Sequence, residues 1–182
     1  NHSFVLIGGW AVYLYTKALK SRDIDLICDY SELEKFRKSY DLIKNDRLKK
    51  YEIHAGEFDI DIYVPFFSDL GIPVEDLEKM GQEREGFAVI RLEALLVLKL
   101  AAFSDRASSI KGEKDKLDII SLLFSEEIDL TEFALLVKKY KLEALLDLLR
   151  RTIKETRSVP ELEISEHTFS RWKKRAMPKI PS

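Results

Sequence analysis

The sequence predicts an α/β fold: a small, twisted, mixed sheet with helices packed on it, followed by a helical C-terminal region. Three observations support this prediction. Short β-forming runs alternate with helix-compatible segments in the first half of the chain. The pair Gly8-Gly9 separates the first such run from a helical segment. The second half carries apolar stretches with helical periodicity. We therefore divide the chain into residues 1–92, which hold the sheet, and residues 93–182, which are helical.

The composition favours a soluble, cytoplasmic protein. Hydrophobic residues make up 46% of the chain and charged residues 34%, and the net charge is only -2, so any basic surface must be local. The single cysteine, Cys28, excludes an internal disulfide framework and fits a reducing cytoplasm. Lys99 interrupts the longest apolar run before it could span a bilayer, and no signal peptide is visible. We expect no membrane contact.

The first strand is predicted at 4–7, and Gly8-Gly9 ends it and opens a helix that runs to about Leu19. Glycine lets the backbone approach a ligand closely, and the free N–H groups at a helix start favour an anion. Taken alone, the pair is a weak signal and favours the plainer interpretation, a turn from strand to helix that requires a positive φ angle.

The stretch from Arg22 to Cys28 is predicted to be a strand. Alternation puts Asp23 and Asp25 on one face and the apolar residues between them on the other. Asp fits a pleated surface poorly, so two on one face require a reason. They either bind a divalent metal or form the polar face of a half-buried strand.

A hairpin is predicted from 51–54 and 58–64, around the turn at 55–57. Its second strand places Asp59 and Asp61 on one face. Either carboxylate could complete a metal site with the first two. We expect His54 to be structural or exposed rather than catalytic.

Further elements are expected along the rest of the chain. Ser31 is predicted to cap a helix over 32–40. The others are a short helix at 74–80, a final strand at 88–92, an apolar helix at 93–103, a helix opening at about 114, two helices across 130–155 broken near Tyr140, and a last helix at 165–176. The last helix carries Arg171, Lys173, Lys174 and Arg175 around Trp172, which indicates a solvated face or a contact to RNA or protein.

The order of Gly8-Gly9, a short helix and the Asp23/Asp25 strand resembles the DNA polymerase β-like nucleotidyltransferase superfamily. Thirteen residues separate Gly9 from Asp23, which fits the usual gap of the family. Within the superfamily, the stretch is similar to the minimal prokaryotic enzymes and to the AbiEii-type toxins of toxin–antitoxin systems. The similarity extends from residue 4 to about 65, and more weakly to about 123. The resemblance implies that residues 1–92 form a nucleotidyltransferase catalytic core. The segment 60–65 resembles the strand that carries the third acid of the family, which favours Asp61.

The resemblance implies that Asp23, Asp25 and Asp61 are catalytic and bind Mg²⁺ or Mn²⁺. It also implies that Gly8 and Gly9 cradle phosphate of a nucleoside triphosphate.

The apolar helix with Lys99, followed by a Lys-Asp-x-x-Asp-Ile segment, is similar to a second signature of these proteins. This implies that Lys99 and Asp115 face the active site, with Lys114 or Arg106 as phosphate contacts. The alternative is ordinary charge on a helix surface, and for Lys99 a stem that reaches to the surface.

The implied reaction moves a nucleoside monophosphate from a nucleoside triphosphate to a hydroxyl-bearing acceptor. The acceptor is RNA or protein in a toxin-like enzyme paired with an antitoxin protein, or a small molecule in a metabolic one. The alternative is a non-catalytic nucleotide-binding or scaffold module with the same fold.

Overall fold

The computed structural model describes residues 3–125 and 128–180. The chain divides into two compact units, Asn1–Arg91 and Leu92–Ser182. In the part that the structure describes, all strands of the sheet lie in the first unit, and the second consists of helices. The predicted fold class, a mixed sheet with helices followed by a helical region, is confirmed.

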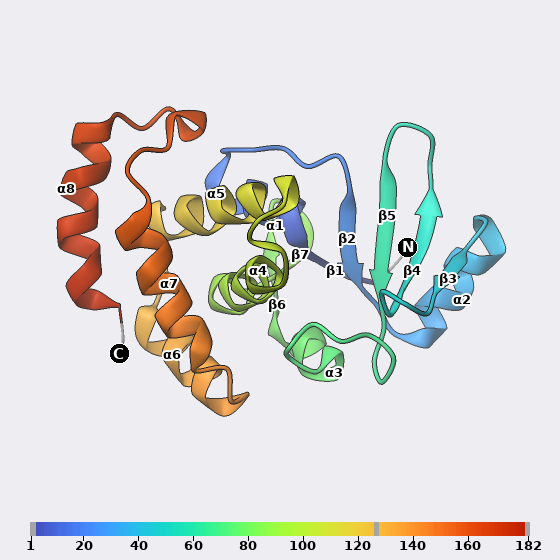
Figure 1. Cartoon of the computed structure of the whole chain (residues 1–182). Helices are drawn as coiled ribbons and strands as arrows, with labels where there is room; N and C mark the ends of the chain where they lie inside the picture. Colours follow the sequence, from blue (N-terminus) through green and yellow to red (C-terminus); the bar gives the residue numbers. More distant parts are fainter. Residues whose placement is uncertain (1–2, 126–127, 181–182) are drawn as a thin grey trace. The chain divides into compact units, whose positions relative to one another are not determined.

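Seven strands of the described residues form one sheet, in the order β3-β4-β5-β2-β1-β7-β6 (Figure 1). β2 runs parallel to β5, and β1 runs parallel to β7, whereas the other neighbours are antiparallel. β2 therefore lies in the middle of the sheet, between β5 and β1. The strands are β1 (Val5–Ile7), β2 (Ile24–Ile27), β3 (Ile43–Asn45), β4 (Lys50–His54), β5 (Asp59–Tyr63), β6 (Gly81–Arg84) and β7 (Phe87–Ile90).

The core of the first unit lies on the apolar side of β2, β4 and β5. Leu26 and Ile62, which are 3% and 0% exposed, pack in one cluster with Leu33 and Phe36 of α2 (Tyr30–Ser39). Successive strand residues point to opposite faces, so the carboxylates that alternate with these apolar residues lie on the other side of the sheet. The short helices α3 (Val74–Leu77) and η1 (Glu78–Met80) confirm the helix predicted at 74–80.

The cap of α2 differs from the prediction. Asp29, not Ser31, is the N-cap residue, and its carboxylate accepts hydrogen bonds from the Glu32 backbone N–H and from the Ser31 hydroxyl. The helix consequently begins two residues earlier than expected. A carboxylate is as good a cap as a hydroxyl, and here the Ser31 side chain becomes a donor to it.

The first helix is shorter than predicted. α1 (Gly8–Thr16) ends at Thr16 because Lys17 adopts a left-handed conformation, with φ 56°, and its N–H bonds back to the Tyr13 carbonyl. This is a helix termination that usually employs glycine, so the sequence carries little sign of it.

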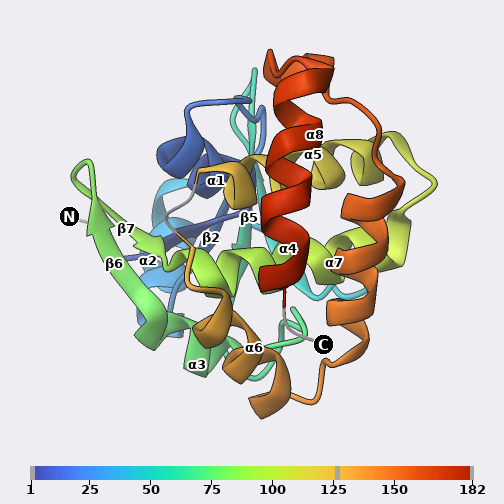
Figure 2. The same cartoon turned by 90° about the vertical axis from the view of Figure 1, so that its left-hand side faces the viewer.

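The second unit is built around α4 (Leu92–Arg106), which packs against α5 (Ile110–Phe124), α6 (Leu130–Lys139) and α7 (Ala144–Glu155) (Figure 2). Apolar residues surround α4 on most sides, as is typical of a central helix. The predicted break near Tyr140 and the last helix, α8 (Glu166–Ala176), are confirmed. α5 begins four residues earlier than expected, because Ser109 caps it. The 3-10 helices η2 (Pro160–Leu162) and η3 (Met177–Lys179) flank α8.

None of the helices in the described ranges is long and apolar enough to cross a membrane.

Candidate active site

Three carboxylates form a row across neighbouring strands. Asp61 on β5 pairs in register with Asp25 on β2, and on its other side with Glu52 on β4. Residues paired in this way point to the same face, and adjacent strands are about 4.8 Å apart. The sheet thus brings two of the three predicted acids side by side and adds Glu52, and we call Glu52, Asp61 and Asp25 the acidic row.

Asp23 lies two residues before Asp25, just ahead of β2, and is partly buried. The negative charges of Glu52 and Asp23 both raise the pKa of Asp61. Burial is the largest cause of this rise, and the Lys50 ammonium opposes it. A raised pKa makes a carboxylate a better base.

Gly8 packs directly on Asp25. It follows β1 with φ +64°, and a Cβ atom built there would lie 2.1 Å from Asp25 Oδ2. Any other residue would therefore displace the carboxylate, besides adopting a conformation that side chains disfavour. Gly9 is buried in the first turn of α1, where backbone N–H groups have no partner within the helix. The turn thus packs on Asp25 and places the first backbone N–H groups of α1 near it.

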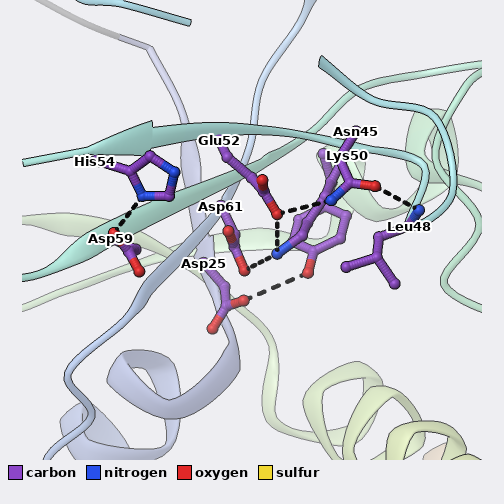
Figure 3. Close-up of polar contacts among 9 residues, drawn as sticks. Asp25, Asn45, Leu48, Lys50, Glu52, His54, Asp59 and Asp61 are labelled. Carbon is purple, nitrogen blue, oxygen red and sulfur yellow. Dashed lines mark hydrogen bonds and ion pairs between the residues drawn. The ribbon is translucent and has the colours of Figure 1, made fainter. Parts of the chain in front are cut away.

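The acidic row is held by two neighbouring side chains (Figure 3). Lys50 Nζ lies 2.5 Å from Asp61 Oδ2 and 2.9 Å from Glu52 Oε1. The Tyr63 hydroxyl donates to Asp25 Oδ1 at 3.5 Å, which is long for a hydrogen bond.

Lys50 and the carboxylates of the acidic row change one another's pKa values. Burial lowers the pKa of the Lys50 ammonium, but its hydrogen bonds to Asp61 and Glu52 outweigh this and hold the pKa above its ordinary value. The hydrogen bond from Lys50 lowers the pKa of Glu52. Lys50 and Glu52 are therefore both charged near neutral pH.

The side chains of Asp23, Asp25 and Asp61 are of the right chemical type for a magnesium site, but their arrangement in this structure does not form one. Carboxylate oxygens from two neighbouring strands are the ligands that Mg²⁺ prefers. Among the described residues, however, no three His, Cys, Asp or Glu side chains are placed so that they could hold a metal ion together. Asp61 accepts a hydrogen bond from Lys50, and Asp25 accepts a long one from Tyr63. Asp23, Asp25 and Asp61 as metal ligands stay a prediction.

Asp59, the alternative third acid, is engaged elsewhere. It lies on the same strand as Asp61, but its Oδ1 is 2.7 Å from His54 Nδ1 at the exposed end of the hairpin (Figure 3). Figure 3 shows this pair apart from the lysine-centred contacts of Asp61 and Glu52.

The pair makes a simple prediction about His54. Its pKa is expected above 6.5, first because of the hydrogen bond to Asp59 and then because of the Asp59 charge. The ion pair should therefore contribute fully to folding below pH 6.5 and be lost as the pH rises through the folded-state pKa. An NMR titration should show that Asp59→Asn lowers this pKa more than Asp61→Asn does. An equal fall in both variants would contradict the pairing.

Lys99 and Asp115 are brought together in the helical unit. Lys99 Nζ, on α4, lies 3.3 Å from Asp115 Oδ1 and 2.7 Å from Asp118 Oδ2, both on α5. Arg106 Nε donates to Asp115 Oδ2 at 2.7 Å. All but Arg106 are buried, so this is not surface charge. That Lys99 and Asp115 face the active site, with Arg106 or Lys114 on phosphate, stays a prediction.

The basic residues of the last helix gain a structural context. Trp172 is 5% exposed and packs its ring against Phe169 and Phe124, so it is part of the core. Lys173 donates to the backbone carbonyls of Lys154 and Thr156 at the end of α7. A cavity of about 800 Å³ lies at that end of α7, and it is lined by Arg150, Arg151, Lys154, Glu155, Arg157 and Met177.

Lys50 and Glu52 were missed as site residues, although the sequence contains a signal for them. The turn at 55–57 was correctly placed, and it pairs His54 with Asp59. Moving two residues away from the turn on each strand, back along β4 and forward along β5, puts Glu52 opposite Asp61. Lys50, two residues further along β4, shares the face of Glu52. Register from the turn would thus have found both.

Comparisons with known proteins give fold similarity only. No protein-family model and no curated protein matches the sequence. Similar solved structures include an antigenic nucleotidyltransferase-like protein from Paracoccidioides brasiliensis (TM-score 0.43, 18% identity, covering 80% of this chain and 84% of that chain). JHP933 from Helicobacter pylori has a TM-score of 0.48 at 18% identity, with 99% and 86% covered. An H. pylori protein assigned as a nucleotidyltransferase has 0.49 at 18%, with 100% and 91% covered. Such values carry no argument about chemistry.

Proposed function

We propose that this protein is a Mg²⁺-dependent nucleotidyltransferase that moves a nucleoside monophosphate from a nucleoside triphosphate to a hydroxyl-bearing acceptor. The single observation that carries the proposal is the alignment of Asp25 and Asp61 on neighbouring strands, with Gly8 packed on Asp25. Few reasons other than ligand binding explain a glycine turn that opens a helix start directly beside paired carboxylates.

The residues of the site have separate roles in this proposal. Asp23, Asp25 and Asp61 would hold Mg²⁺ or Mn²⁺, which supplies charge stabilisation for the phosphates and activation of the acceptor hydroxyl. Gly8 and Gly9 would bind phosphate through backbone N–H groups at the start of α1. Asp61, whose pKa burial raises, would accept the proton of the acceptor hydroxyl.

The acceptor is proposed to be a macromolecule with phosphate groups, such as RNA. The basic cavity at the end of α7 supports this, because it gathers four Arg and Lys side chains with a single Glu in a chain whose net charge is -2. A toxin-like enzyme of the cytoplasm, held in check by an antitoxin protein, is the version we propose. Protein and small-molecule acceptors are the other outcomes of the assay.

One observation favours the alternative, a non-catalytic nucleotide-binding or scaffold module. Lys50 already contacts both Asp61 and Glu52 and offsets one of their two negative charges, so part of the row is satisfied without a metal. A transfer assay decides between the two. The protein is supplied with Mg²⁺, an α-labelled nucleoside triphosphate and cellular RNA, protein and metabolites. Label on an acceptor, with pyrophosphate released, supports the enzyme; nucleotide binding without transfer to any acceptor supports the module.

Metal and nucleotide binding are expected to raise the melting temperature. At a ligand concentration of 100 times Kd, linkage stabilises by about 2.7 kcal/mol. That corresponds to roughly 5–10 °C for a chain of this size. The double variant Asp23→Asn/Asp25→Asn should lose most of the shift in a thermal melt, whereas Asp59→Asn should keep it. An unchanged shift in the double variant would mean that the ligand binds elsewhere.

A further inference from the structure

The ammonium of Lys50 is fixed between two carboxylates of the acidic row (Figure 3). The side chains of Lys50, Asp61 and Glu52 are only 13%, 16% and 17% exposed. Asn45 Nδ2 donates to Glu52 Oε1 at 3.1 Å, the oxygen that also contacts Lys50. The lysine is therefore a built part of the site and not a surface ion pair.

The positive charge of Lys50 reduces the repulsion among the carboxylates of the acidic row. Like charges directly opposite each other on neighbouring strands destabilise a sheet. Glu52 and Asp61 are opposite each other, and Asp61 has Asp25 on its other side. A cation beside Asp61 relieves this repulsion, whether it is an ammonium or a metal ion. An ammonium and a divalent ion held together at Asp61 Oδ2 would repel each other strongly, so binding of one disfavours the other.

We propose that Lys50 occupies one cation position of the acidic row, and that a divalent ion which binds Asp61 displaces the ammonium, after which Glu52 contributes an oxygen to the ion. The inference rests on the proposed function, which supplies the divalent ion. Lysine suits such an exchange because its charge is carried on a flexible four-carbon stem. The backbone of Lys50 remains paired with Asn45 while the head group moves.

Lys50 is thus a positioning residue. It keeps Glu52 and Asp61 together before the metal arrives, and it sets how readily the metal enters. The exchange also accounts for the present arrangement, in which no three acidic side chains of the described residues can hold an ion together.

The test is direct binding of Mn²⁺ without nucleotide, measured from the free-ion signal in electron paramagnetic resonance. Lys50→Met should bind Mn²⁺ more tightly than the wild-type protein by about tenfold, because a unit positive charge beside the ion is removed. Lys50→Arg should bind weakly, like the wild type. Lys44→Met is the matched control, since Lys44 is an exposed neighbour on β3 that pairs with Asp46. Adding Glu52→Gln to Lys50→Met should cancel most of the gain.

The repulsion left in Lys50→Met could unfold the sheet, so circular dichroism and a melt at each Mn²⁺ concentration accompany the binding curves. A destabilised variant whose melting temperature rises with Mn²⁺ more than that of the wild type supports the exchange. Wild-type affinity in Lys50→Met, with an equal rise in melting temperature, overturns it and leaves the proposed transfer untouched. Absence of Mn²⁺ binding in every variant, wild type included, overturns both this inference and the metal dependence of the proposed function.

Discussion

Asp61→Asn is expected to lower the rate of nucleotidyl transfer by about 10²–10⁴-fold, the range for loss of a general base. Asp61 is the middle member of the acidic row, so the substitution removes the carboxylate that contacts Lys50 and neighbours both Asp25 and Glu52. Asn preserves the shape, and its side-chain oxygen can still accept from Lys50. The fold should therefore persist, and a thermal melt alongside the label-transfer assay checks this.

Asp59→Asn is the matched control, because Asp59 lies on the same strand and the same face but its side chain is 50% exposed and pairs with His54. It should keep most of the transfer activity. If Asp59→Asn lost transfer and Asp61→Asn kept it, the third acid would be Asp59. Equal retention in both variants would speak against a catalytic role for β5.

The faces of the central strands could be predicted from the sequence because their signal is local. Alternation of Asp with Ile and Leu defines which side chains share a face, and a buried apolar face enforces it. That Asp25 pairs with Asp61 could not be predicted in this way. The pairing is parallel and joins strands more than thirty residues apart, so no turn sets its register. The order of the motifs and the family resemblance predicted that the two strands lie near each other. Only the structure gives the register in which they pair.

The two missed strands are the edges of the sheet. β3 and β6 lie at opposite ends of the strand order, and most of their residues are exposed. A strand with no buried face has no apolar periodicity, and edge strands favour charged residues that discourage further pairing. The sequence Gly-Gln-Glu-Arg of β6 therefore resembles a loop. These strands exist because their neighbours offer hydrogen bonds, which is a tertiary cause.

The first residues of the helices were predicted inaccurately for a different reason. The helices themselves follow from apolar periodicity, but their first residues depend on which of several capping side chains bonds to the backbone. Near α2, Asp29 and Ser31 compete, and Asp29 prevails because it accepts from both the backbone and Ser31. Such a choice is settled by fractions of the energy of one hydrogen bond.

Lys99→Met is expected to destabilise the protein by about 3–5 kcal/mol, the usual cost of removing one partner from a buried ion pair. The side chains of Lys99, Asp115 and Asp118 are 9%, 2% and 1% exposed. Asp115 would retain Arg106, but the carboxylate of Asp118 would lose the ammonium 2.7 Å away. Burial already raises the pKa of Asp118, and Lys99 is the first influence that opposes this rise. Denaturant unfolding measures the loss.

Lys116→Met serves as the control, because Lys116 pairs with the exposed Glu113 on the surface of α5. Its effect should stay within about 0.5 kcal/mol. Adding Asp118→Asn to Lys99→Met should recover part of the lost stability, since it removes the charge that the first substitution left unpaired. If this double variant folds and still transfers no label, while Asp118→Asn alone remains active, Lys99 has a role at the reacting phosphates beyond the ion pair. Recovery of transfer together with stability would instead assign Lys99 to the core of the helical unit.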